Sequence, residues 1–218
     1  AKKMLTSIIN ENWLSARAVF GLYPASAENE DIIIYADESR TTELTRWVGL
    51  RQQHKQPKGR FNLALADFVG KRDYVGAFAV TAGHRIEERV AAFEAANDDY
   101  SAIMLKSLAD RLAEAAAEWL HLQVRTQYWG YASEESLDNQ ALIAEQYKGI
   151  RPAPGYPACP DHTAKRELFA LLNAPTNAGM VLTESCAMMP AAAVSGFYIG
   201  HPGAAYFAIP KIARDQLE

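Results

Sequence analysis

The sequence predicts an α+β domain with one twisted, mainly antiparallel sheet flanked by helices. Segments with the strand pattern lie towards both ends of the chain, whereas the middle third has the spacing of helices. With 218 residues, 49% of them hydrophobic, the chain can bury a core of its own and suits a single fairly large domain.

The first third is expected to contain a short helix and three strands. Residues 3–15 have modest helical amphipathicity. Strands are predicted at 17–23, where Pro24 should end the strand, at 31–35 and at 74–81. The last of these has a continuous apolar core, which predicts burial on both faces.

The middle of the chain is predicted to be helical. Residues 87–127 are rich in Ala, Leu and Glu, and Asn97-Asp98-Asp99 offers an N-cap that divides them into two helices, the second one long. Gly130 should end the long helix. A further helix is expected at about 134–147.

The last third begins with a loop of four prolines in nine residues, 152–160, followed by a helix at 163–172. Three strands are then expected, with a hairpin turn between the last two: 180–183, 193–199 and 205–209, with the turn at 200–203. Residues 213–218 read as the start of another helix, and we expect the natural chain to continue there.

Composition excludes several classes of function. The net charge of −4 does not favour nucleic acid, which requires a basic face, and no apolar run approaches the roughly 18 residues that cross a bilayer. Two distant cysteines and no apolar signal region indicate a cytoplasmic protein with free thiols. The chain has no GxGxxG, GxxxxGK[ST], HExxH or GxSxG motif, which disfavours a Rossmann-type methyltransferase or dehydrogenase.

The proline-rich loop 151–162 is a candidate binding segment. Proline fixes φ and removes N–H donors, so the loop is held extended and could keep side chains still for a ligand. Arg151 offers a planar fork for a carboxylate, and Gly155 allows a bound group to approach the backbone. A rigid connector between two helices is an equal alternative.

Asp110, Glu114 and Glu118 lie at i, i+4 and i+8 on one face of the long helix. A solvated face is the favoured explanation of this row, and an anionic strip that receives a cation is the other. Cys159 and His162 could be half of a zinc site, but no second half is visible, so we expect no metal. The aromatic residues of 197–207 fit a strand core, or a ring stacked on a purine or facing a sulfonium.

Several of these segments together resemble the activation domain of cobalamin-dependent methionine synthase. The resemblance is strongest in the RPAPGYPACP sequence of 151–160, and it extends over nearly the whole chain. The matching segments are 21–25, 50–53, 67–69, 109–115, 128–131, 149–160, 182–185, 194–196 and 214–216.

The resemblance implies a single C-shaped domain covering 1–218, without the family's N-terminal helical segment and its extreme C-terminus. Members of the family bind S-adenosylmethionine in an extended pose on the concave face. Cobalamin is carried by a separate domain, and a flavodoxin-like or other reductase supplies an electron. The domain then supports reductive methylation of inactive cob(II)alamin to methylcobalamin, so this chain would be part of a methyltransferase, with no membrane or nucleic-acid partner.

The resemblance also implies roles for individual residues. Arg151, Glu114, Tyr206 and Phe207 match ligand-contacting positions of the family, although relatives often have Tyr where Phe207 stands. Ala153, Gly155 and Tyr156 of the matched loop complete the expected S-adenosylmethionine site, and Asp110 and His162 are expected to face the cobalamin partner. No catalytic acid or base is expected, and the family's upstream aspartate is not found in this sequence.

Three hypotheses are open at this point. The chain is the activation region of a full-length synthase, a separate protein that reactivates a corrinoid protein in trans, or a non-catalytic α+β module whose binding site has decayed. The missing upstream aspartate and Phe207 are the only support for the third.

Overall fold

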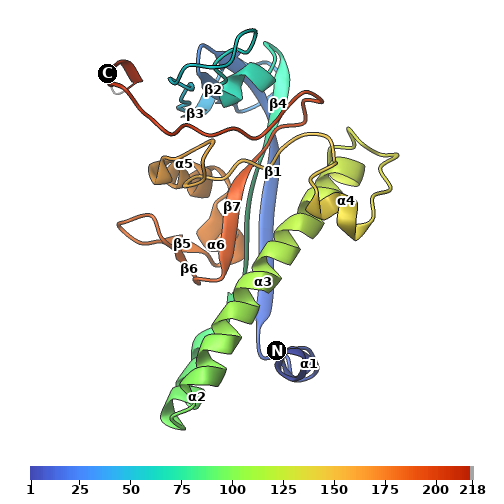
Figure 1. Cartoon of the computed structure of the whole chain (residues 1–218), viewed down its shortest axis with the longest axis vertical. Coiled ribbons are helices and arrows are strands. Elements are labelled where there is room, and N and C mark those ends of the chain that lie inside the picture. Colours follow the sequence, from blue (N-terminus) through green and yellow to red (C-terminus); the bar gives the residue numbers. More distant parts are fainter. Residues whose placement is uncertain (217–218) are drawn as a thin grey trace.

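The computed structural model describes residues 1–216 and has a five-stranded, fully antiparallel sheet in the order β3-β2-β1-β4-β7 (Figure 1). A two-stranded hairpin stands apart from it. The predicted α+β class with a mainly antiparallel sheet is confirmed. The strands are β1 (Ser15–Glu28), β2 (Asp31–Tyr35), β3 (Glu43–Trp47), β4 (Asp73–His84) and β7 (Ala193–Tyr198), with the hairpin β5 (Val181–Leu182) and β6 (Met188–Met189).

The central strand β4 is buried on both faces, as its apolar sequence predicted. Val75 and Ala77 point into a core shared with the helices α5 (Lys165–Leu171) and α6 (Ala174–Ala178). Phe78 and Val80 point to the opposite face and pack against the long helix α3. The period-two alternation of β4 therefore places helices on both faces of the sheet.

Helix α3 (Asp99–Gln123) crosses one face of the sheet and follows α2 (Ile86–Ala95), which confirms the predicted pair of helices (Figure 1). Asp98 is the N-cap, since its carboxylate accepts a hydrogen bond from the Ser101 backbone N–H at 3.0 Å. A π-helical turn continues α3 to Tyr128, just before Gly130. The remaining helices are short: α1 (Lys2–Asn10) and α4 (Asn139–Ile143), with 3-10 turns at Leu65–Phe68, His162–Ala164 and Arg214–Gln216.

Two predicted elements differ clearly in extent from the structure, and one strand was missed. Strand β1 does not end at Pro24 but runs through it, because β2 pairs with β1 only from Ala25 onward and leaves that side of Pro24 without a ladder partner. The helix expected at 134–147 shrinks to the five residues of α4, and the strand β3 was not predicted at all.

The expected strand 205–209 and the hairpin at 200–203 do not form, and residues 204–210 have no regular secondary structure. The edge of β7 that this strand would have needed is already occupied, since Ile150 pairs with Ile199 through two backbone hydrogen bonds of 2.9 and 3.1 Å. Residues 204–210 instead run beside the proline-rich loop, where the Ile209 N–H donates to the Pro157 carbonyl. Part of the helix expected at 213–218 lies outside the described residues.

Within the described part of the chain, no helix is long and apolar enough to cross a membrane.

Candidate functional site

The proline-rich loop is fastened to the edge of the sheet before it reaches its tip. After the Ile150–Ile199 pair, the Phe197 N–H donates to the Pro152 carbonyl at 2.9 Å. At the tip, Gly155 has a φ of +95° and its N–H donates to the Cys159 carbonyl at 2.7 Å. The left-handed conformation favours glycine at that position, and the anchored loop can hold its side chains in fixed places.

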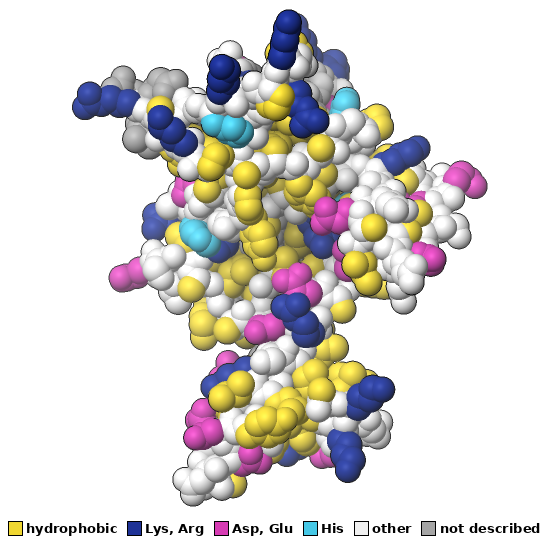
Figure 2. Space-filling view, in the orientation of Figure 1, with side chains coloured by type: hydrophobic (Ala, Val, Ile, Leu, Met, Phe, Trp, Pro, Cys, Tyr) yellow, Lys and Arg dark blue, Asp and Glu magenta, His cyan; other side chains and the backbone are white. Residues whose placement is uncertain are grey.

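A groove of about 380 Å³ lies between this loop, helix α3 and the C-terminal segment. We call it the Arg151 groove. Figure 2 shows hydrophobic side chains gathered in the middle of this face, with acidic side chains beside them. The groove is lined by Phe78, Glu114, Glu145, Arg151, Pro152, Ala153, Tyr156, Pro157, Ala158, Val194, Tyr206 and Phe207.

Six of the seven residues predicted to bind S-adenosylmethionine line this groove, although they come from three distant parts of the sequence: Glu114, Arg151, Ala153, Tyr156, Tyr206 and Phe207. Gly155, the seventh, is exposed at the tip of the same loop and is not among the lining residues. The two residues predicted to face a partner, Asp110 and His162, are exposed and lie outside the groove.

Arg151 is held at both its backbone and its side chain. Its N–H donates to the Tyr206 hydroxyl at 2.9 Å. Its side chain is only 16% exposed, and the guanidinium donates from Nη1 and Nη2 to the same Glu118 oxygen, Oε2, at 3.1 and 3.0 Å. Burial opposes the charged form, but the Glu118 carboxylate outweighs it and raises the pKa of Arg151.

Behind Arg151 lies a buried polar cluster formed by the end of α3, the π-helical turn and the loop after it. His121 Nδ1 is 3.2 Å from Arg151 Nη1, and the fully buried Arg125 forms a bidentate ion pair with Glu135 at 2.7 and 3.1 Å. Burial, followed by the charges of Arg125 and Arg151, lowers the pKa of His121 well below its ordinary value. His121 is therefore neutral, and Nδ1 can accept a hydrogen bond from Arg151.

The aromatic wall of the groove combines fixed and free rings. Burial raises the pKa of the Tyr206 hydroxyl, which the Arg151 N–H partly offsets. Tyr156 is 58% exposed and Tyr206 is 41% exposed, so both rings present surface to a ligand. Phe207 packs near Phe68, with ring centroids 6.5 Å apart.

His162 supports the loop from outside the groove. Its ring lies against Gly155, and its Nδ1 is 2.9 Å from Nζ of the buried Lys165. Among residues 1–216 there is no group of three or more side chains that could hold a metal ion. Cys159 is a buried free thiol, and burial raises its pKa to about 11.

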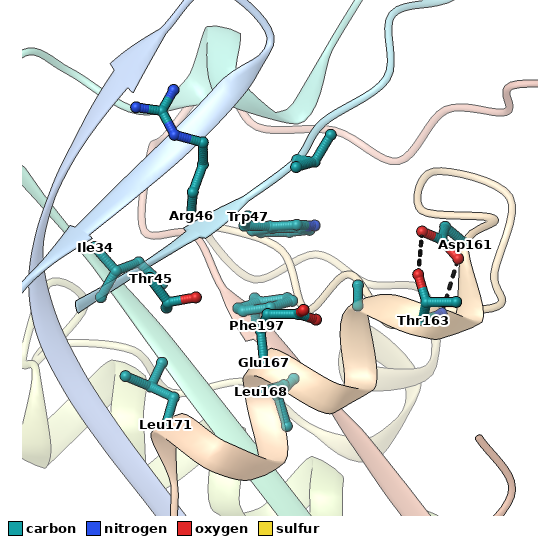
Figure 3. A pocket seen from close by; sticks show the side chains of 12 residues that line it. Ile34, Thr45, Arg46, Trp47, Asp161, Thr163, Glu167, Leu168, Leu171 and Phe197 are labelled. Carbon is teal, nitrogen blue, oxygen red and sulfur yellow. Dashed lines mark hydrogen bonds between the residues drawn. The ribbon is translucent and has the colours of Figure 1, made fainter. Parts of the chain in front are cut away.

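A second, smaller hollow of about 100 Å³ lies between the edge strand β3 and helix α5 (Figure 3). Trp47 and Phe197 stack inside it with ring centroids 3.7 Å apart, and Glu167 lies at its rim. None of the predicted site residues lines this hollow. The Arg151 groove is therefore the better candidate.

The sequence did not identify every member of the site. Of the carboxylate row, Asp110 is solvated, Glu114 lines the groove and Glu118 turns inward to Arg151, so a single explanation for all three was wrong. Their i, i+4 spacing was a usable signal for a shared face, but it could not show where that face lies. Glu145 and His121 gave no signal of their own.

The anchored loop and the groove define a small-molecule-binding α+β domain with an open site. Residues 1–218 match the family described as "Vitamin B12 dependent methionine synthase, activation domain", and the chain belongs to that family. It is also similar to the protein in the "Crystal Structure of the MetH Reactivation Domain bound to AdoHcy". The two share 52% sequence identity and a TM-score of 0.96, over 99% of this chain and 68% of that one.

Proposed function

We propose that this chain binds S-adenosylmethionine in the Arg151 groove and presents its methyl group to a cobalamin held by another domain, so that inactive cobalamin is returned to methylcobalamin. The observation that carries the proposal is the presence of an arginine fork and an acidic side chain, Glu114, in one aromatic-lined groove. The similar reactivation domain was solved with AdoHcy, which is what remains of S-adenosylmethionine after methyl transfer.

The groove offers a complementary group for each part of the ligand. The carboxylate would pair with the Arg151 guanidinium. The ammonium and the sulfonium would be favoured by the carboxylates of Glu114 and Glu145, and the purine by the exposed faces of Tyr156 and Tyr206. Phe207 has no hydroxyl to offer a side-chain hydrogen bond, but its ring gives the groove an apolar face.

The chain's own contribution to the reaction is positioning. Cobalamin on its own domain would supply the reduced cobalt that accepts the methyl group, and S-adenosylhomocysteine would leave with the electron pair of the broken C–S bond. Methyl transfer of this kind is a direct displacement, so the groove need not supply an acid or a base. Arg151 and the fixed loop would align the methyl group with its acceptor. Such alignment lowers the activation barrier most when the reacting atoms are held about 3–3.5 Å apart.

The openness of the site agrees with a partner that docks on it. We infer that the cobalamin-binding domain covers the groove on the side of Asp110 and His162, both exposed. A flavodoxin-like or other reductase would supply the electron, and the cytoplasm is the compartment in which these partners meet. Because Arg151 and Glu114 are both retained in the groove, a decayed site is not favoured.

Calorimetric titration with S-adenosylmethionine tests the proposal, with Arg151→Ala as the site variant and Arg111→Ala as the matched control on the exposed face of α3. Losing a charge-assisted hydrogen bond costs about 1.5–3 kcal/mol, so Arg151→Ala should weaken binding by about tenfold or more. Arg111→Ala should bind as the wild type does. Failure of the wild-type chain to bind, or equal affinity of Arg151→Ala, would contradict the proposal.

A further inference from the structure

In the described structure the guanidinium of Arg151 has one edge without a partner. An arginine side chain has five N–H donors. Glu118 Oε2 accepts two of them, one from Nη1 and one from Nη2, and His121 Nδ1 lies within hydrogen-bond distance of the other Nη1 donor. Among the residues that the structure describes, the Nε–H and the second Nη2–H have no partner. These two lie on one edge of the guanidinium and form a bidentate fork.

We propose that Glu118 and His121 are positioning residues that hold the Arg151 guanidinium by its outer edge, so that its Nε–Nη2 edge receives the carboxylate of the ligand. This inference rests on the proposed function and deepens it. Both residues belong to α3 and are three positions apart, so they share one face of a rigid helix. The sheet-anchored loop brings Arg151 to that face.

The ring of His121 is fixed from two sides. It stacks on Tyr198 with centroids 5.0 Å apart and planes 14° apart, and it meets Tyr147 edge-on at 5.0 Å. Its Nε2 is 3.5 Å from the Tyr131 hydroxyl. With the ring clamped, Nδ1 is directed at Arg151, and this leaves the guanidinium little freedom to rotate.

Stability alone does not explain this cluster. Glu118 Oε1, Arg125 Nη1 and the Tyr198 hydroxyl are buried without a hydrogen-bond partner in the described structure. Buried unpaired polar groups cost free energy, and apolar residues of similar volume often stabilise a fold as well as a buried ion pair does. An incompletely paired cluster directly behind a groove residue therefore indicates a role at the groove.

The test compares two ligands on Glu118→Ala and Glu118→Gln. S-adenosylmethionine has the carboxylate, whereas decarboxylated S-adenosylmethionine lacks it but keeps the sulfonium, the amine and the purine. Glu118→Ala should weaken the first by about tenfold, as expected for disturbing a charge-assisted contact, and the second by less than about twofold. Glu118→Gln keeps an oxygen that accepts from Arg151, so it should recover at least half of the lost binding free energy for S-adenosylmethionine.

The outcomes separate the two proposals. If wild-type chain fails to bind S-adenosylmethionine, the proposed function and this inference both fall. If wild type binds, then equal losses for the two ligands, no loss, or tighter binding by Glu118→Ala overturn the positioning role alone. Glu87→Gln, on the exposed face of α2, is the matched control and should change neither affinity. Thermal unfolding of each variant identifies losses of binding that come from misfolding. If Glu118→Ala does not fold, the affinities of Glu118→Gln for the two ligands test the positioning role instead.

Discussion

Breaking the Arg125–Glu135 pair should be among the most destabilising single changes in the chain. Arg125 has no exposed side-chain surface, Glu135 is only 7% exposed, and three hydrogen bonds of 2.7–3.1 Å join them. Among the described residues, Glu135→Ala would leave the buried guanidinium with Glu118, 3.9 Å away, as its one acidic ion-pair partner. Removing one partner of a buried ion pair costs about 3–5 kcal/mol.

The remaining Glu118 charge compensates Arg125 in part, so we expect the lower end of that range, about 3 kcal/mol. Urea unfolding followed by tryptophan fluorescence measures the loss as a lower transition midpoint at an unchanged slope. The double variant Arg125→Met with Glu135→Leu removes both charges and should recover at least half of the loss. A loss below about 1 kcal/mol in Glu135→Ala would refute the reasoning, because it would mean that water reaches the guanidinium.

Three further predictions concern separate features. Gly155→Ala should weaken S-adenosylmethionine binding in a titration, because the φ of +95° strains any other residue by about 1–3 kcal/mol and the new Cβ would overlap the His162 ring. Unchanged binding would show that the conformation of the loop tip does not affect the site. Asp98→Ala should cost about 1 kcal/mol of unfolding free energy by removing the N-cap of α3, and no change in urea midpoint would count against the cap. Burial and two neighbouring guanidinium groups lower the pKa of His121 well below its ordinary value, so as pH falls the unfolded chain binds a proton there before the folded chain does. The free energy of unfolding should therefore decrease below about pH 6.5, and His121→Gln should make its dependence on pH less steep.

Local pattern was enough for the elements whose contacts repeat along the chain. The apolar run of β4 and the helical spacing of α3 each indicate which side chains are buried. Both elements appear where the sequence predicted them. The cap at Asp98 is equally local, since donor and acceptor are three residues apart. The distinctive proline-rich loop carried the family resemblance and with it the candidate site.

The sequence by itself determined the fold class, the main helix and strand, and six of the residues that line the Arg151 groove. Only the tertiary structure decided that β1 continues through Pro24, that residues 204–210 pair with no strand, and that Glu118 rather than Asp110 turns to Arg151. Each of these depends on pairing that local pattern does not show. The β1–β2 ladder begins only at Ala25, Ile150 occupies the edge of β7, and the anchored loop brings Arg151 to Glu118. Spacing along a helix shows which side chains share a face, but burial of that face depends on what the rest of the chain packs against it.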